Sequence, residues 1–205
     1  MDLKKLENRF RIDLKKLNRY TDREDLKVIH YTEDGHIEMT NSHVGVRAKN
    51  VYEGSEKFKH GKTPEHYPEM NHLFDQYVSK NVIEDIPIKE FEDIFEPFKS
   101  EKPEVIHLNF APNGIFIDAG GNKSGLKINL DISKSYQVTL RYDYLLIIIQ
   151  FMRLLGLTTF NLYYPDGLST LSFINENLEI IIAPVRNSSK KVFDGVKKLE
   201  KEQLT

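Results

Sequence analysis

The chain has 205 residues, of which 40% are hydrophobic and 11% aromatic, and its formal charge is −2. A chain of this length and composition can bury a substantial core, as one large domain or as two small ones. The near-neutral charge does not by itself indicate a nucleic-acid partner, and the absence of cysteine excludes disulfides, thiolate metal sites and cysteine nucleophiles.

The first 20 residues carry seven basic and three acidic side chains, which gives a net charge of +4. The alternation of Phe10, Ile12 and Leu14 predicts a short strand, and the spacing from Leu14 to Leu17 predicts a short helix after it. One amphipathic helix over residues 3–20 is the alternative interpretation.

Three antiparallel strands are expected in residues 26–52. Asp34-Gly35 lies between two alternating runs, which is a strong hairpin signal, and Asn41-Ser42-His43 predicts the next turn. Residues 53–81 are rich in Lys, His, Pro and Glu and predict a connector, of which residues 66–77 pack on the surface.

The order of strand, helix and three strands then recurs twice. Pro97 and Gly156 each indicate where a helix ends. A unit of roughly 50 residues therefore repeats three times, and a repeat constrains the fold more than any single motif. Residues 187–205 predict an amphipathic helix beyond this repeat. The later elements are a strand and short helix at 84–98, three strands at 104–132, a strand and helix at 136–156, and strands at 158–164, 169–174 and 178–185.

This repeat resembles the half-domain unit of DNA sliding clamps, in which two units make a domain with helices inside and sheets outside. Four segments also resemble motifs of the bacterial β-clamp, the DNA polymerase III β subunit, in that family's order. They are TNSHVGVRA (40–48), GKTPEHYPEMNHLF (61–74), RYDYLLIIIQFMRLLG (141–156) and EIIIAPVR (179–186).

The resemblance implies an α+β protein of the DNA-clamp fold, shortened relative to β-clamps. It divides the chain into a partial clamp-like half-domain, a connector, a complete clamp-like domain and a C-terminal helix. The ranges are 1–60, 61–83, 84–186 and 187–205.

In β-clamps, the turn with the histidine, the Phe-Pro segment and the final Pro and Arg line one pocket between two domains. Polymerases, loaders and repair proteins insert a short peptide there, typically Gln-x-x-Leu-x-Phe. The resemblance implies such a pocket here, with an apolar floor for the anchors and a few polar groups that orient them. Its residues are Thr40, Ser42, His43, Val44, Tyr67, Pro68, Ile182, Pro184, Val185 and Arg186. The alternative is that the segment EIIIAPVR (179–186) is only the end of a core strand.

A ring clamp holds DNA by a basic, sequence-blind inner surface of helices. The first helix region supplies seven cations for such a surface, although a solvated basic face is the alternative. They are Lys4, Lys5, Arg9, Arg11, Lys15, Lys16 and Arg19. The helix of the second unit is acidic and opposes phosphate binding. Its carboxylates are Glu84, Asp85, Glu90, Glu92, Asp93 and Glu96, against Lys89.

We expect neither catalysis nor a bound metal or cofactor. His60, His66 and His72 lie six residues apart, and no pair of them has the helical spacing of a zinc motif. The Gly-rich segment 118–125 lacks P-loop spacing and predicts a hairpin turn. Carboxylate pairs such as Glu92-Asp93 fall in runs predicted to be exposed, so they do not indicate an active site.

The resemblance thus implies a DNA polymerase processivity factor, phage- or plasmid-encoded, that forms a homo-oligomeric ring on double-stranded DNA. Its partners are replication proteins, such as the polymerase and clamp loader, that carry a short peptide motif. Only three half-units are counted against six in a β-clamp, so the alternative is a clamp-fold adaptor or decoy that never encircles DNA. A nucleic-acid-processing enzyme is a third hypothesis, and the lack of a ligand cluster counts against it.

The sequence also predicts a cytoplasmic location without a membrane partner. No apolar segment of a signal peptide follows Met1. The longest apolar stretch, residues 145–149, is far shorter than the ~20 residues that span a bilayer.

Overall fold

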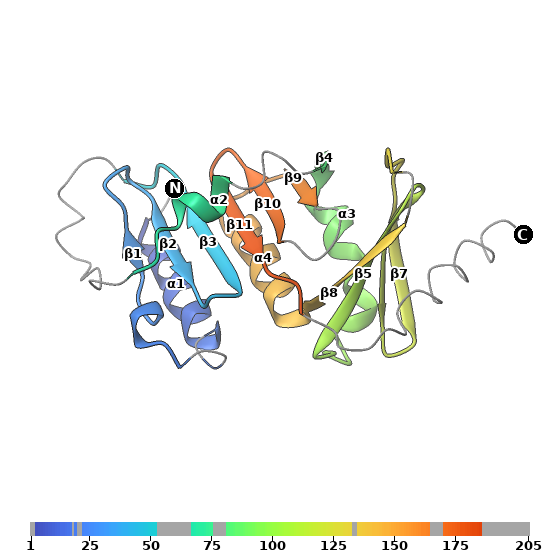
Figure 1. Cartoon of the computed structure of the whole chain (residues 1–205), viewed down its shortest axis with the longest axis horizontal. Coiled ribbons are helices and arrows are strands. Elements are labelled where there is room, and N and C mark those ends of the chain that lie inside the picture. The colour runs from blue at the N-terminus through green and yellow to red at the C-terminus, as the bar shows by residue number, and fades with distance from the viewer. Residues whose placement is uncertain are drawn as a thin grey trace, which may run out of the picture.

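The computed structural model describes residues 3–17, 19, 22–52, 67–75, 81–132, 135–164 and 170–185. Two antiparallel sheets form an elongated body, and helices pack against them (Figure 1). The helices are α1 (Leu3–Leu17), the 3-10 turn η2 (Glu24–Leu26), α2 (Asn71–Phe74), α3 (Ile88–Asp93), the 3-10 turn η5 (Glu96–Phe98) and α4 (Tyr142–Leu154). The strands are β1 (His30–Tyr31), β2 (Ile37–Thr40), β3 (Val44–Ala48), β4 (Asn81–Pro87), β5 (Val105–Ala111), β6 (Gly114–Ala119), β7 (Asn122–Lys127), β8 (Tyr136–Arg141), β9 (Thr159–Tyr164), β10 (Leu171–Asn175) and β11 (Leu178–Ile182).

The predicted order of strand, helix and three strands is confirmed for the second and third units, β4–α3–β5–β6–β7 and β8–α4–β9–β10–β11. The first unit differs, because the strand predicted around Phe10–Leu14 is wrong and α1 runs unbroken from Leu3 to Leu17. Leu6, Phe10 and Leu14 recur at helical spacing and are buried, whereas Ile12 is 51% exposed. The alternating pattern was therefore part of a helical stripe.

The second and third units exchange their first strands. One sheet has the order β1-β2-β3-β11-β10-β9-β4, and the other has the order β7-β6-β5-β8. Thus β4 pairs with β9 of the third unit, while β8 pairs with β5 of the second unit. The first unit joins differently, because its last strand β3 simply pairs with the last strand β11.

The predicted turns lie where the sequence placed them. Asp34-Gly35 falls in the connection between β1 and β2, and Gly35 has a left-handed φ of 82°. Gly156 follows α4 with a φ of 66°, as expected for a residue that ends a helix. The Gly-rich segment forms the β6–β7 hairpin, as predicted. The helix predicted at 187–205 lies outside the described residues.

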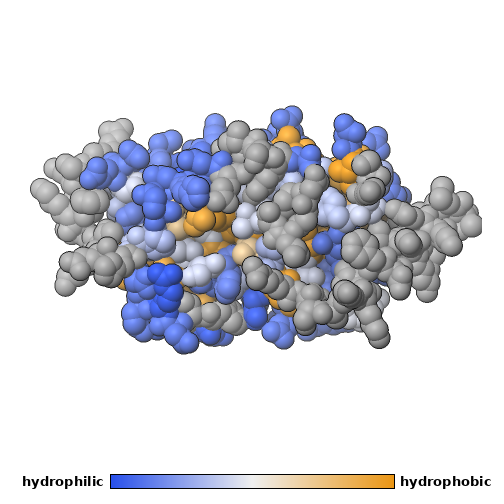
Figure 2. Space-filling model, in the orientation of Figure 1, coloured by the Kyte–Doolittle hydropathy of each residue, from blue (hydrophilic) through white to orange (hydrophobic). Residues whose placement is uncertain are grey.

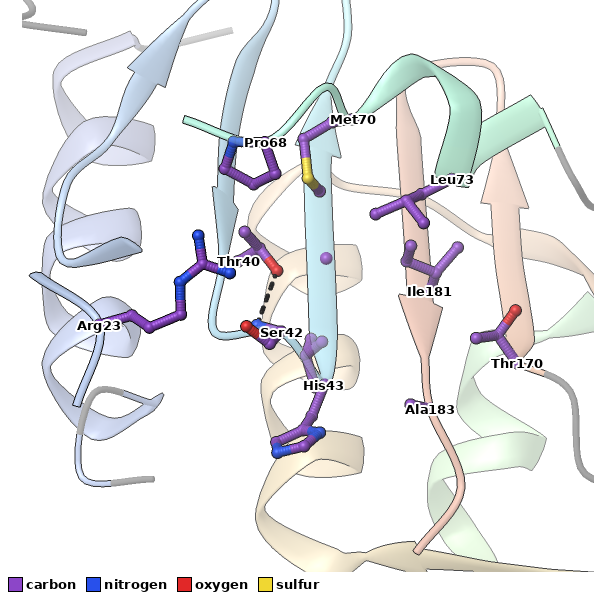
Figure 3. Close-up of a pocket in the computed structure, with 12 residues that line it drawn as sticks. Arg23, Thr40, Ser42, His43, Pro68, Met70, Leu73, Thr170, Ile181 and Ala183 are labelled. Atoms are coloured by element: carbon purple, nitrogen blue, oxygen red, sulfur yellow. Dashed lines mark hydrogen bonds between the residues drawn. The ribbon is translucent and has the colours of Figure 1, made fainter. Parts of the chain in front are cut away.

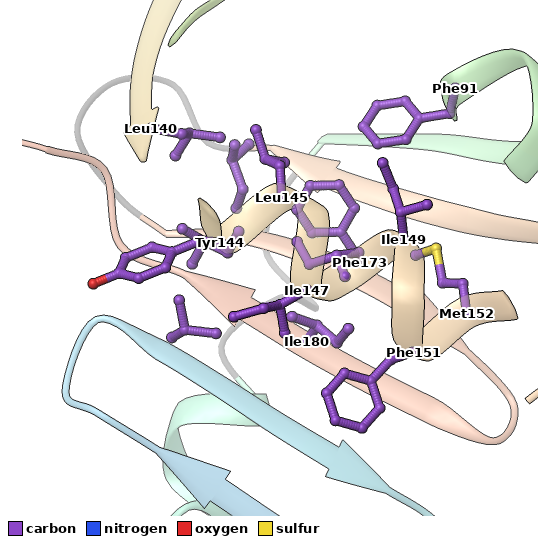
Figure 4. Close-up of a cluster of buried hydrophobic side chains, with 14 of the residues drawn as sticks. Phe91, Leu140, Tyr144, Leu145, Ile147, Ile149, Phe151, Met152, Phe173 and Ile180 are labelled. Atoms are coloured by element: carbon purple, nitrogen blue, oxygen red, sulfur yellow. The ribbon is translucent and has the colours of Figure 1, made fainter. Parts of the chain in front are cut away.

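The main core surrounds α4, which contacts both sheets, α1 and α3. Figure 4 shows its apolar side chains among those of α3, β8, β10 and β11. Phe91 of α3 lies 5.0 Å from Phe160 of β9 and 5.9 Å from Phe173 of β10, measured between ring centroids. On the other side of α4, Phe10 of α1 meets Phe151 edge-on at 4.8 Å. Three units thus share one continuous core.

Helices α1 and α4 cover one face of the seven-stranded sheet, whereas α2 lies on the opposite, outer face (Figure 1). In the same orientation, Figure 2 shows hydrophobic surface near α2, β3 and β11, within a largely hydrophilic exterior. Among the described residues, no helix has both the length and the apolar character required to cross a bilayer.

Candidate functional site

The outer face of the seven-stranded sheet carries two cross-strand rows at the junction of β2, β3 and β11. Strand register places Thr40, Gly45 and Ile181 side by side in one row. Two residues farther along, Glu38, Arg47 and Glu179 form the second row. The alternate residues of the same strands point into the core under the helices, because side chains alternate between the faces of a sheet.

Segment 67–75 lies over both rows and forms one wall of a partly open cavity of about 250 Å³ above the first row (Figure 3). Met70 and Leu73 point from this segment toward Ile181 and form an apolar wall. Gly45 lets Met70 and Ile181 pack closely against the strand, since a Cβ there would lie 2.9 Å from both Ile181 Cγ1 and Met70 Cε. The lining comprises Arg23, Thr40, Ser42, His43, Val44, Gly45, Pro68, Met70, Leu73, Thr170, Ile181 and Ala183.

The polar rim of this cavity is a tight turn organised by the buried Asn41. Its Oδ1 accepts hydrogen bonds from the backbone amides of His43 (3.0 Å) and Val44 (2.8 Å). Its Nδ2 donates to the hydroxyl of Tyr144 on α4 (3.1 Å) and to the last carbonyl of α1 at Leu17 (3.4 Å). An asparagine here stabilises the turn, which places Ser42 at a left-handed φ of 74°.

The structure brings five of the ten residues predicted for the pocket to this cavity, namely Thr40, Ser42, His43, Val44 and Pro68. Ile182 does not join them, because strand alternation turns it into the core with no exposed surface and presents Ile181 instead. Arg186 lies outside the described residues.

Residues 183–185 leave the cavity and run toward the second sheet. The amide of Ala183 donates to the carbonyl of His43 (2.7 Å), and that of Val185 donates to the carbonyl of Thr139 in β8 (2.8 Å). Pro184 and Val185 are half-buried and do not line the cavity. The end of the strand therefore bridges the two sheets.

Tyr67 lies beside the cavity, against the sheet. Its ring stacks on His30 with 4.4 Å between centroids, and its buried hydroxyl has no hydrogen-bond partner among the described residues. Burial raises the pKa of Tyr67, so the phenol remains neutral. Tyr67 thus packs the start of segment 67–75 against the sheet without lining the cavity.

Several lining residues were missed by the sequence analysis. Alternation along β3 and β11 could have identified Gly45 and Ile181, which share the outer face with Thr40. Arg23 and Thr170 come from irregular segments that no pattern connects with the turn.

The second row is a buried network of charges. Arg47 lies between Glu38 (2.6 Å) and Glu179 (3.3 Å), Lys49 also pairs with Glu179 (3.1 Å), and His30 bonds Glu38 (3.0 Å). Burial acts to raise the pKa of Glu38, but the hydrogen bond from His30 and the charge of Arg47 outweigh it, so this pKa is lowered. Glu38 therefore remains an anion in the folded protein near neutral pH.

The helix-covered side of the molecule carries the predicted basic surface. Six cations lie exposed along or just after α1: Lys4, Lys5, Arg11, Lys15, Lys16 and Arg19. Arg9 is turned inward and bonds Asp13 of α1 and Gln150 of α4. Lys16, Arg19 and Asp143 line a second cavity of about 240 Å³ between α1 and α4.

The acidic helix of the second unit is less repulsive than its sequence indicates. Glu92, expected to be exposed, is only 8% exposed and pairs with Arg153 of α4. Asp93 pairs with Lys89 (3.4 Å) and Glu96 with Lys99. The prediction of an exposed Glu92-Asp93 pair is therefore wrong at Glu92, because α4 places an arginine beside it.

Within the described ranges, no three His, Asp or Glu side chains are arranged to hold a metal ion. His60 and His66 fall outside those ranges, and His72 lies exposed on α2.

No protein-family model and no curated protein sequence matches this chain. Solved structures do match. A Helicobacter pylori β-clamp bound to a DNA ligase peptide superposes with a TM-score of 0.60 at 13% identity, over 87% of this chain and 63% of that one. The fold is that of the β-clamps.

Two further structures agree. The DNA polymerase III β subunit of Pseudomonas aeruginosa gives a TM-score of 0.59 at 9% identity, over 86% of this chain and 65% of that one. The DNA polymerase III β subunit of Borrelia burgdorferi, in complex with a natural product, gives a TM-score of 0.60 at 11% identity, over 87% of this chain and 63% of that one. The chain thus spans less than two thirds of the length of these clamps.

Proposed function

We propose that this protein is a sliding-clamp-like docking protein that binds short peptides of replication proteins in the cavity beneath segment 67–75. The observation that carries the proposal is the cavity itself. Its floor and wall are apolar, its rim is polar, and it is formed where two repeated units meet. A site with apolar anchors and few polar groups suits a short extended peptide. In the proposal the protein acts by binding and not by catalysis.

The β-clamp of Helicobacter pylori with its bound DNA ligase peptide supports this choice of ligand. The proposal keeps the division into a partial half-domain (1–60), a connector (61–83) and a complete clamp-like domain (84–186). In this division the cavity lies at the junction of the partial half-domain and the complete clamp-like domain.

Contact with DNA is the second part of the proposal. Lys4, Arg11, Lys15 and Arg19 make no ion pair with a described carboxylate, so they are available for phosphates. By contrast, Lys89, Lys99 and Arg153 on the same side pair with carboxylates of α3 and η5. Phosphate contact would therefore come mainly from α1 and weaken steeply with salt.

A processivity factor and an adaptor would both use the cavity, and strand topology favours the adaptor. Each unit ends in a strand, and the last strands β3 and β11 pair with each other. Of these last strands, β7 is the one whose outer edge has no partner strand in the described part of the chain. Head-to-tail rings need two complementary edges per copy. The outer edge of β1 is only two residues long, and exposed Lys123 and Lys127 on β7 discourage pairing.

The proposed peptide binding is tested by fluorescence anisotropy of a labelled Gln-x-x-Leu-x-Phe peptide. Wild type is expected to bind at micromolar concentration. Gly45→Val is expected to lose binding, because its side chain would collide with Ile181 and Met70 and displace the apolar wall. Ser124→Val on the distant strand β7 is the matched control and should bind like wild type. Lack of binding by folded wild type would overturn the proposal.

Mass and DNA retention separate the two roles. An adaptor is expected to be a monomer or dimer and to leave nicked circular DNA in high salt. A ring would show a larger closed assembly that stays on the circle and leaves it only after linearisation.

A further inference from the structure

We infer that Arg47 positions the wall of the cavity by holding segment 67–75 in register over the sheet. The inference rests on the proposed peptide binding, because it assigns to Arg47 the placement of side chains that would contact the peptide. Arg47 itself does not line the cavity.

Arg47 is 6% exposed and has a partner on every side. Its Nε donates to Glu38 (2.6 Å) and its Nη1 to Glu179 (3.3 Å), so the neighbouring strands neutralise its charge. Its Nη2 leaves the sheet and donates to Asn71 Oδ1 of α2 (2.6 Å). The planar guanidinium also lies 4.3 Å from the ring centroid of Phe74. Arg47 thus joins β2, β3, β11 and α2 at one point.

Arg47 contacts Asn71 and Phe74 of α2, and each of these residues directly follows a residue of the cavity wall. Asn71 follows Met70, and Phe74 follows Leu73. Within one helical turn, fixing two side chains also fixes the direction of their neighbours. The contacts of Arg47 therefore orient Met70 and Leu73.

The segment depends on these contacts for its structure. An isolated helix of one turn is unstable in water, and α2 has four residues. Apolar packing of Met70 and Phe74 with Ile181 holds the segment against the sheet. Such packing is non-directional, whereas the bond from Arg47 to Asn71 specifies one register.

A lysine cannot replace Arg47 in this arrangement. Its single ammonium lacks the fork that reaches acceptors on three elements at once, and it stacks less well on an aromatic ring. A lysine at position 47 would still place a positive charge between Glu38 and Glu179, but α2 would lose the hydrogen bond at Asn71.

The test uses variants at Asn71, which is exposed and can be changed without disturbing the buried carboxylates. Asn71→Ala removes the acceptor, Asn71→Asp keeps it, and Asp75→Ala at the C-cap of α2 is the matched control. The readouts are hydrogen exchange of the amides in segment 70–75 without ligand, the affinity of the Gln-x-x-Leu-x-Phe peptide, and the urea midpoint.

Asn71→Ala is expected to exchange faster in this segment and to bind the peptide about tenfold more weakly. Its urea midpoint should change little, because the segment opens locally before the sheets unfold. Asn71→Asp and Asp75→Ala are expected to behave like wild type. Arg47→Lys should reproduce the Asn71→Ala exchange pattern.

Equal exchange and equal affinity in Asn71→Ala and wild type would overturn the inference. If wild type binds no peptide, the proposed function fails separately, and the exchange measurement still decides whether Arg47 holds the segment.

Discussion

The two junctions between repeated units of this protein are built in different ways. The second and third units exchange their first strands, so β4 and β8 each belong to the sheet of the other unit. The first unit meets the third along the edges of β3 and β11, through five residue pairs. The contact of α1 with α4 and the hydrogen bond from Asn41 to Tyr144 of α4 also join the two units.

This difference explains where the cavity lies. At the exchanged junction the aromatic cluster of Phe91, Phe95, Phe160 and Phe173 is buried between α3 and strands β9 and β10. At the edge junction one sheet face remains uncovered until segment 67–75 packs on it. Pairing along strand edges therefore leaves one face of the sheet open at the junction, and a separate segment can form the wall of a groove there.

The largest expected effect compares the two junctions directly. Phe91→Ala should lower the free energy of unfolding by about 3–5 kcal/mol, because it leaves a cavity among three aromatic rings. Phe10→Ala should cost about 3 kcal/mol, but mainly by detaching the first unit from α4. Urea titration followed by circular dichroism and by hydrogen exchange of residues 3–17 measures both.

Phe91→Ala is expected to unfold in one transition, whereas Phe10→Ala should release residues 3–17 at lower urea than the rest. Ile12→Ala, on the exposed face of α1, is the control and should change little. A single coincident transition in Phe10→Ala would show that the edge junction is as cooperative as the exchanged one.

A smaller effect is expected at Asn41, which couples the edge junction to the rim of the cavity. Asn41→Ala leaves two backbone amides and the Tyr144 hydroxyl without this partner, and should cost about 2 kcal/mol. Asn41→Asp keeps the acceptor for both amides, loses the donor and adds a carboxyl group to a fully buried site. It should therefore cost less than Asn41→Ala at a pH low enough to keep that carboxyl neutral. Chemical denaturation measures the free energy of unfolding of the two variants. Equal losses would mean that the stabilisation comes from the hydrogen bonds of Asn41 to α1 and α4, not from its bonds within the turn.

Much of this architecture follows from periodicity in the sequence. The strand, helix and three-strand order of the second and third units was predictable because turn residues punctuate clear alternation. The first unit was misjudged at α1, because Phe10, Ile12 and Leu14 satisfy an alternating pattern over a window too short to exclude a helix. Burial of Leu6, Phe10, Leu14 and Leu17 on one face resolves that ambiguity.

The site was predictable only in part. The turn around His43 and the residue Pro68 were found by resemblance, whereas Ile181 required the register of β11, which the run of three isoleucines does not reveal. Arg47 was missed although β2, β3 and β11 each carry one charged residue among apolar neighbours. That pattern signals a buried cross-strand network, but only once the three strands are known to be adjacent.

The smallest expected effect is the pH-dependent part of the stability that Glu38 contributes to the edge junction. The folded pKa of this carboxyl lies below its usual value, so the unfolded chain binds a proton more tightly than the folded protein does. The contribution is fully present above the unfolded pKa, near 4.5, and is lost as pH falls through the folded pKa.

Glu38→Gln should therefore differ most from wild type at pH 6–7, and the difference should narrow below about pH 4.5. The urea midpoint of both proteins between pH 7 and 3 measures this, with Glu104→Gln at a largely exposed position as the control for loss of one charge. Because Glu38 bonds Arg47, a narrowing confined to Glu38→Gln would assign acid sensitivity to the edge junction. The same narrowing in Glu104→Gln would instead reflect the net charge of the chain. The acid sensitivity would then not be specific to the network of Glu38, Arg47 and Glu179.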